Sequence, residues 1–313
     1  MGTEAQGLLA RARQLVGGVR SYRWNRGDHV SGEAPIIIGG CGRSGTTLMR
    51  VILDSHSQIA CGPESNIFPS PHRLNPGSPG AEKLGRKFDF SPEEMSHLLR
   101  TSSTRAEFAE RFFDAYRQKA GKPLWADKTP RNIQVMPYIL EHFPRARFVH
   151  VIRDGRDVVC SLRTHPRHRV IDGRIVKLDT WNPLEDCVQR WVTDVGDGLA
   201  YRGDPRYYEL KYEDLVMHTE ETLRRLLDFL ELPWEPQVMS FHQVQSTSRD
   251  PVKFAQNPEA TRPLQSSSIG RWKRDLSEAD LARLLRACGP LLRQLGYLGD
   301  GAATAPADPP PPT

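Results

Sequence analysis

Short apolar segments alternate with longer amphipathic segments along most of this chain. Residues 36–38, 147–152 and 207–210 are short runs rich in apolar, β-branched or aromatic side chains. Continuous apolar character over so few residues predicts strands that are buried on both faces. Helical periodicity is found at residues 46–55, 91–100, 105–119, 131–142, 155–164, 184–202, 219–231 and 277–295. Strands that alternate with helices predict an α/β fold in three layers, with a central, mainly parallel sheet flanked by helices.

Composition divides the chain into one large central region and two short ends. Residues 1–33 form a basic, weakly patterned N-terminal extension, and residues 299–313 form a proline-rich tail that cannot bury a core and is predicted to be disordered. The 265 or so residues between them carry no linker-like stretch. We therefore predict a single domain over residues 34–298.

The formal net charge of +5 and the sequence pI near 9.0 indicate an anionic partner. The basic residues are not interleaved with aromatic residues in one run, so a small charged nucleotide is favoured and nucleic acid is not. The chain has five cysteines with no CxxC spacing, which favours a reducing compartment over a disulfide scaffold or a zinc site. No run of 18 apolar residues occurs, so no transmembrane segment is predicted. Together these features predict a cytoplasmic and bacterial protein.

Residues 35–47 combine a predicted strand with a glycine-rich turn into a helix. The spacing approaches the ATP-binding pattern Gly-x-x-x-x-Gly-Lys-[Ser/Thr], with Gly40 and Gly45 in frame, but Thr46 replaces the lysine and Arg43 lies inside the loop. Gly40, Gly42 and Gly45 predict positive φ angles and a close approach to an anion. The backbone amides of residues 44–47 would then point at that anion from a helix N-terminus. A glycine-rich turn without a ligand is the alternative interpretation.

The turn lies on the side of the predicted sheet where ligands usually bind. Gly39 and Gly40 directly follow one predicted strand, and Arg153 directly follows another. In open parallel sheets, ligands bind beyond the carboxyl ends of the strands. The loop and Arg153 are therefore expected at the same edge.

Six segments in order carry a resemblance to a known family. They are residues 43–50 (RSGTTLMR), 61–64 (CGPE), 127–130 (DKTP), 153–157 (RDGRD), 211–215 (KYEDL) and 270–273 (GRWK). The chain resembles the sulfotransferase superfamily over residues 34–298, nearest to the protein-tyrosine sulfotransferases and their bacterial relatives. The resemblance implies a P-loop-like fold and transfer of a sulfuryl group from 3′-phosphoadenosine 5′-phosphosulfate (PAPS) to an acceptor hydroxyl, with no metal ion.

The same resemblance implies roles for individual residues at the reacting end of the site. Glu64 matches the general base, with a salt bridge to a loop arginine as the alternative. Lys128 and Arg43 would stabilise the charge that develops during transfer, and Asp127 and Thr129 would shape the turn. Loop residues would bind the 5′-phosphosulfate; these are Arg43, Ser44, Gly45, Thr46 and Thr47.

Other matched residues would bind the rest of the nucleotide. Arg153 and Ser161 correspond to the pair that grips the 3′-phosphate, for which a bidentate arginine is suited. Tyr212 would lie at the nucleotide site, or be an ordinary core tyrosine. Arg271 or one serine of residues 266–268 would complete it, while Arg156 and Asp157 could form an ordinary ion pair at a helix start.

Two other functions stay open at this stage. A P-loop kinase is disfavoured by the missing loop lysine and by the absence of an apolar strand that ends in aspartate and could hold Mg²⁺. A non-catalytic nucleotide-binding protein is disfavoured by the presence of both Glu64 and Lys128. The acceptor could be a small molecule, a sugar, a lipid or a peptide tyrosine, and the sequence does not predict the oligomeric state.

Overall fold

The computed structural model describes residues 28–70, 74–165, 167–171, 174–178, 181–243 and 263–299, with no side-chain detail for residues 167–178. Most of the predicted N-terminal extension and the predicted tail from residue 300 lie outside these ranges. The division into an extension, one domain and a tail therefore stays a prediction.

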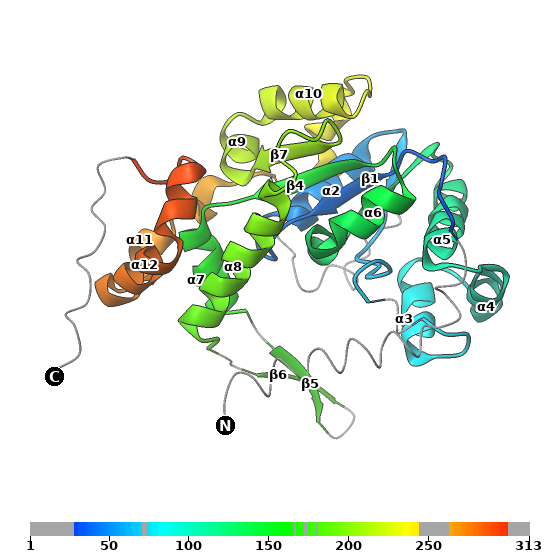
Figure 1. Ribbon diagram of the computed structural model, residues 1–313, viewed down its shortest axis with the longest axis horizontal. Helices are drawn as coiled ribbons and strands as arrows, with labels where there is room; N and C mark the ends of the chain where they lie inside the picture. The colour runs from blue at the N-terminus through cyan, green and yellow to red at the C-terminus, as the bar shows by residue number, and fades with distance from the viewer. Residues whose placement is uncertain are drawn as a thin grey trace.

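A parallel sheet of five strands forms the centre of the described chain, in the order β2-β3-β1-β4-β7. Figure 1 shows helices on both faces of this sheet, which confirms the predicted three-layer α/β fold. The central strand has no polar side chain because both of its faces are covered, and each of its residues is buried. The strands are β1 (Ile36–Gly39), β2 (Ile59–Cys61), β3 (Leu124–Lys128), β4 (Arg147–Ile152) and β7 (Tyr207–Lys211).

Alternate residues of the strands point into two different hydrophobic cores. Ile37 and Phe148 pack with α5 and α6 on one face, whereas Ile36 and Ile38 pack with α2 and α10 on the other. A third core joins α7, α8 and α12 beside the loop that follows β1. These helices are α2 (Thr46–Ser55), α5 (Arg105–Ala120), α6 (Met136–His142), α7 (Gly155–Arg163), α8 (Leu184–Leu199), α10 (Thr219–Phe229) and α12 (Glu278–Gln294).

Several shorter elements complete the described chain. A two-stranded antiparallel ribbon leaves the main sheet after α7 and returns to α8. Its strands are β5 (Arg167–Ile171) and β6 (Arg174–Leu178), and the additional helices are α3 (Pro79–Lys87), α4 (Pro92–Thr101), α9 (Tyr212–Met217) and α11 (Trp272–Asp275). Short 3₁₀ turns occur at η2 (Pro130–Val135), η3 (Pro236–Val238), η4 (Phe241–Gln243) and η7 (Ser266–Ser268).

The helix predicted over residues 131–142 is divided in the structure. A 3₁₀ turn, η2, runs to Val135, and α6 starts anew at Met136 with Pro137 in its first turn. Proline has no N–H to continue a preceding α-helix but fits a first helical turn, where that N–H would have no partner. The division places η2 directly behind β1 and the glycine-rich loop, with Gly40 N donating to Pro130 O at 3.0 Å.

Strands β2 and β3 were not predicted, and β3 bears on the argument against a kinase. Its last two residues are Asp127 and Lys128, so a carboxylate lies near the end of a partly apolar strand. The Asp127 carboxylate accepts hydrogen bonds from Asn132 Nδ2 at 2.9 Å and Thr129 Oγ1 at 3.4 Å. Asp127 is therefore engaged in shaping the turn into η2, as expected for it and Thr129.

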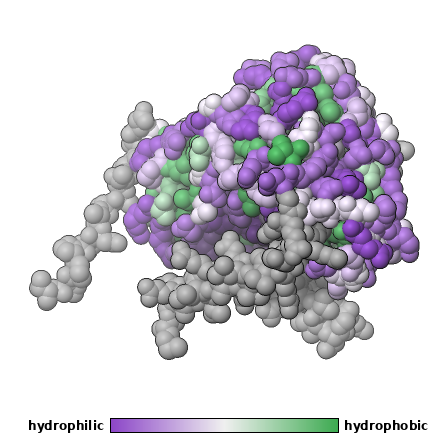
Figure 2. Space-filling view, turned by 45° about the vertical axis from the view of Figure 1, so that its right-hand side comes forward, coloured by the Kyte–Doolittle hydropathy of each residue, from purple (hydrophilic) through white to green (hydrophobic). Residues whose placement is uncertain are grey.

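The surface that Figure 2 shows is largely hydrophilic, with apolar residues in small separate groups. The four exposed large apolar side chains in the described ranges are dispersed: Val30, Trp181, Met217 and Met239. All five cysteines are buried, and none forms a disulfide. Within the described ranges, no helix is both long and apolar enough to cross a membrane.

Candidate active site

The glycine-rich loop runs from β1 to α2 as predicted. Gly40 has a φ of 139° and Gly45 a φ of 98°, both in the region that favours glycine. A Cβ on Gly45 would lie 2.5 Å from Cδ2 of Tyr212, so this position also has no room for a side chain. No side chain caps α2 and no acidic residue lies in its first turn. The amides of the first turn of α2 lie at the helix N-terminus, where the helix dipole favours an anion.

Gly42 has a different role from the one predicted. Its φ is not positive, and the non-glycine residue Arg43 adopts a φ of 75° instead. A Cβ on Gly42 would lie 2.9 Å from a terminal guanidinium nitrogen of Arg190, which extends from α8. Because Gly42 has no side chain, the Arg190 guanidinium can lie directly against the loop. Arg190 was not predicted as a site residue, because it lies more than 140 positions after Gly42 and no local pattern connects the two.

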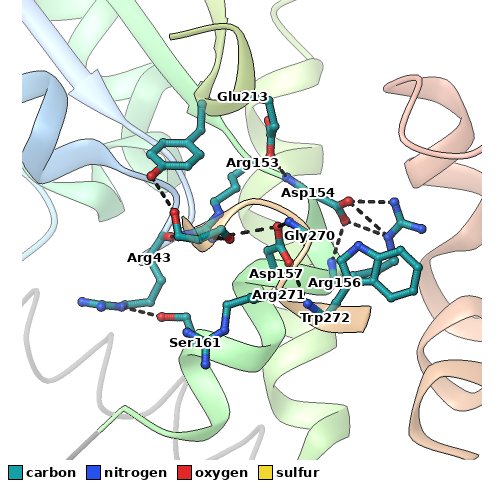
Figure 3. Close-up of polar contacts among 12 residues, drawn as sticks. Arg43, Arg153, Asp154, Arg156, Asp157, Ser161, Glu213, Gly270, Arg271 and Trp272 are labelled. Carbon is teal, nitrogen blue, oxygen red and sulfur yellow. Dashed lines mark hydrogen bonds and ion pairs between the residues drawn. The ribbon is translucent and has the colours of Figure 1, made fainter. Parts of the chain in front are cut away.

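Arg153 joins the loop to the C-terminal part of the site. Its guanidinium donates to the carbonyl oxygen of Arg43 at 3.2 Å and to that of Ser268, and it lies over the Tyr212 ring with 4.7 Å between Cζ and the centroid. Figure 3 shows these groups converging between the loop, α7 and residues 266–272. Arg153, which directly follows β4, is buried.

Ser161 and Tyr212 also lie at this junction. Arg43 Nε donates to Ser161 Oγ at 3.0 Å, so the predicted phosphosulfate and 3′-phosphate residues are in direct contact (Figure 3). The Tyr212 hydroxyl and Ser268 Oγ share a hydrogen bond of 2.8 Å. Tyr212 is thus a buried tyrosine whose polar end faces the site.

Arg271 is close to this junction, but its guanidinium has another partner. Arg271 Nε donates to Asp275 Oδ2 at 2.6 Å, within the single turn of α11. The expected ion pair between Arg156 and Asp157 is not formed. Arg156 instead pairs with Asp154 at 2.7 Å and covers the Trp272 ring, which leaves the Asp157 carboxylate to main-chain amides.

The residues at the loop fit an anionic group. Ser44 Oγ and Arg153 Nε are buried and have no hydrogen-bond partner within the described ranges. Buried donors without partners are costly, and a bound anion with several oxygens would satisfy both. Together with the uncapped start of α2, they form a site that suits phosphate or sulfate groups of a nucleotide.

Glu64 and Lys128 form an ion pair next to the loop. Lys128 Nζ donates to Glu64 Oε1 at 2.6 Å and to Thr47 Oγ1 at 3.3 Å. The Lys128 side chain is 3% exposed, whereas that of Glu64 is 41% exposed. Lys128 therefore connects a solvent-accessible carboxylate to the first turn of α2, so the proposed salt bridge of Glu64 exists but its partner is a lysine.

Charges around Glu64 control its protonation. Burial raises the pKa of Glu64, but the attraction of Lys128, with smaller contributions from Lys87 and Arg50, outweighs burial and leaves the pKa below its ordinary value. Burial lowers the pKa of Lys128 while Glu64 opposes that shift. Glu64 is thus ionised near neutral pH, and its Oε2 can accept a proton while Oε1 stays bound to Lys128.

A second lysine, Lys87, contacts the same segment and was not predicted. Its Nζ donates to the backbone carbonyl of Glu64 at 3.0 Å from the last turn of α3. The adjacent Phe88 packs so closely on Gly62 that a Cβ there would lie 2.3 Å from Cε1 of the ring. The end of α3 therefore fixes the path of residues 62–64. The sequence offers no motif for this contact, since α3 follows a stretch rich in proline, glycine and serine.

No cluster of three or more side chains suited to a metal ion occurs in the ranges that the structure describes. The site that these ranges define is a phosphate-type loop, an adjoining set of arginines and an ion-paired glutamate.

The fold and the site are accompanied by sequence similarity to a known family over most of the chain. A sequence model of the Sulfotransferase family matches residues 35–236, and the chain belongs to this family. The resemblance inferred from the six segments is thereby confirmed.

Individual relatives give the family context. The chain is 28% identical to the protein-tyrosine sulfotransferase of Drosophila melanogaster over 288 residues, which cover 89% of this chain and 53% of that protein. It thus spans about half the length of this curated relative. The fold is similar to the sulfotransferase domain of the Synechococcus PCC 7002 olefin synthase (TM-score 0.62, 20% identity, 83% of this chain and 96% of that chain). It is also similar to mouse sulfotransferase SULT7A1 complexed with PAP (TM-score 0.53, 11% identity, 86% and 89%).

Proposed function

We propose that this protein transfers a sulfuryl group from PAPS to an acceptor hydroxyl. The observation that carries the proposal is the link from Glu64 through Lys128 to Thr47, which connects a candidate base to the phosphate-type loop. Membership of the Sulfotransferase family and similarity to a protein complexed with PAP support the same co-substrate.

In the proposed mechanism, the acceptor oxygen attacks sulfur in line while the bond from sulfur to the leaving phosphate breaks. Glu64 takes the acceptor proton on its exposed carboxylate. The product nucleotide, 3′,5′-adenosine bisphosphate (PAP), leaves with the electrons of the broken bond between sulfur and the phosphate oxygen. Lys128 and Arg43 stabilise the charge on the transferring and leaving oxygens, which is effective because Lys128 is excluded from water. A sulfuryl group carries less negative charge than a terminal phosphate, so the proposal contains no metal ion.

The nucleotide would bind along the loop, from the start of α2 to Arg153. Ser44, Thr46 and Thr47, with the loop amide of Gly45, would hold the 5′-phosphosulfate. Arg153 and Ser161 would hold the 3′-phosphate, with Tyr212 beside the nucleotide. Arg271 could contribute only by leaving Asp275, its partner in the structure.

The identity of the acceptor and the cellular location do not follow from the geometry of the site. The relative in Drosophila melanogaster is a protein-tyrosine sulfotransferase, and a peptide tyrosine is therefore the first acceptor to test, followed by small phenols, sugars and lipids. A cytoplasmic location and a bacterial origin stay predictions from the sequence.

The two alternative functions make different demands on the site. A kinase would need Mg²⁺ ligands, and Asp127, the carboxylate at the end of β3, is already bound by Asn132 and Thr129. A non-catalytic nucleotide-binding protein would have no use for an ionised Glu64 beside the loop.

The test is PAP release from PAPS in the presence of each acceptor class. Wild-type protein should release PAP with one acceptor class, and a Glu64→Ala, Lys128→Ala double variant should lose this activity. Glu82→Gln is the matched control, since Glu82 is an exposed carboxylate on α3 that pairs with Arg86. Unchanged transfer in the double variant would remove the proposed mechanism, and phosphate transfer from ATP would favour the kinase.

A further inference from the structure

Residues 266–272, termed here the C-terminal strap, cover the junction between the loop and α7. The strap contains η7 and ends where α11 begins, with Gly270 between them at a φ of 71°. Figure 3 shows the strap passing across Arg153 and Asp157. More than a hundred positions separate it along the chain from the α7 residues that it contacts.

One end of the strap is held by a single carboxylate. Asp157 Oδ2 accepts the backbone N–H of Gly270 at 2.7 Å, and Oδ1 accepts that of Trp272 at 3.0 Å. The Asp157 side chain is 0% exposed, and its Oδ2 lies 3.9 Å from a terminal nitrogen of Arg153. Both oxygens are thus used, and hydrogen bonds to an ionised acceptor are stronger than neutral ones.

The other end of the strap is held by two residues of the proposed nucleotide site. Ser268 accepts from Arg153 through its carbonyl oxygen and shares a hydrogen bond with the Tyr212 hydroxyl through Oγ. Arg153 also donates to the Arg43 carbonyl in the loop. The position of the strap therefore determines where Arg153 and Tyr212 lie relative to the loop.

We propose that Asp157 is a positioning residue for nucleotide binding: its carboxylate docks the C-terminal strap onto Arg153 and Tyr212 and so completes the nucleotide site. This inference rests on the proposed function, because the nucleotide is the 3′-phosphate-bearing ligand of that site. Asp157 itself contacts no ligand in this account and acts through the strap.

Two observations distinguish the proposed role of Asp157 from the usual role of an acidic residue at the N-terminus of a helix. The helix-start partner of Arg156 is Asp154, which also accepts the Arg156 amide at 2.9 Å. Asp157 lies in the first turn of α7, but it neither caps the helix nor pairs with Arg156. Burial raises the pKa of Asp157, and the two strap amides oppose that shift because they stabilise the ionised carboxylate.

The test compares Asp157→Ala and Asp157→Asn with Asp280→Asn, a control that removes a carboxylate paired with Arg163 of α7 but not with the strap. Calorimetric titration with PAP measures affinity, and hydrogen exchange of the peptide that covers residues 266–272 measures docking. Asp157→Ala should weaken PAP binding about tenfold or more and accelerate strap exchange by a similar factor. Asp157→Asn, which keeps the volume and one acceptor oxygen, should lie between Asp157→Ala and wild type. The KM for the acceptor should not change.

Each outcome bears on a different claim. Faster strap exchange with unchanged PAP affinity overturns the positioning role, and so does unchanged exchange in Asp157→Ala. Failure of the wild-type protein to bind PAP would instead count against the proposed function, while the exchange data would still decide whether Asp157 docks the strap.

Discussion

Gly45 provides a sharp test of how the loop and Tyr212 are packed together. Substitution by alanine has two separate costs. A φ of 98° is unfavourable for any residue with a Cβ, by about 1–2 kcal/mol. The new Cβ would also lie 2.5 Å from Cδ2 of Tyr212, and such overpacking costs about 1–3 kcal/mol. The ring can avoid the clash only by moving away from Ser268 and Arg153, which both contact it.

The control is Gly203→Ala, because Gly203 has nearly the same φ, 99°, with no atom within 4 Å of its ideal Cβ. Gly203→Ala should lose about 1–2 kcal/mol of unfolding free energy in urea and bind PAP like the wild type. Gly45→Ala should lose about 2–5 kcal/mol and bind PAP at least about tenfold more weakly. Equal losses of stability and equal PAP affinities for the two variants would refute the packing argument.

Three further predictions concern the charged groups near Glu64. Lys128→Met removes the main charge that lowers the pKa of Glu64, so the acid limb of the kcat/KM profile should move to higher pH; an unmoved limb would mean that another group is the base. Burial raises the pKa of Asp127 from 3.8 to about 6, so about 3 kcal/mol of unfolding free energy should be lost as the pH rises from 3.8 to about 6. In Asp127→Asn, the free energy of unfolding in urea should depend less on pH over this range. Lys87→Met frees the Glu64 carbonyl and should lower kcat about five- to thirtyfold with PAP affinity unchanged; weaker PAP binding would contradict this assignment.

The sequence predicted the parts of the fold that depend on local pattern. Strands β1 and β4 are apolar because both faces are covered, and the glycine spacing after β1 indicated the loop. Strand β2 was missed because three residues are too few to define a period. Strand β3 was missed because Asp127 and Lys128 interrupt its apolar pattern where it reaches the site.

The contacts that assemble the site could not be predicted from the same information. The motifs indicated Glu64 and Lys128 separately, whereas their ion pair depends on where the ends of β2 and β3 meet in space. Lys87 acts through its position at the end of α3. Asp157 was predicted as a helix-start residue, since no sequence pattern indicates that a segment more than a hundred residues away would supply its amide partners.

The central claim, that Arg153 and the loop form a PAPS site, is tested most directly by calorimetric titration of wild-type protein and Arg153→Ala with PAP and, separately, with ATP–Mg²⁺. The account predicts that the wild type prefers PAP and that Arg153→Ala loses this binding, since Arg153 is the cation that joins the loop to the C-terminal strap. Preference of the wild type for ATP–Mg²⁺, or binding of neither nucleotide, would contradict the account.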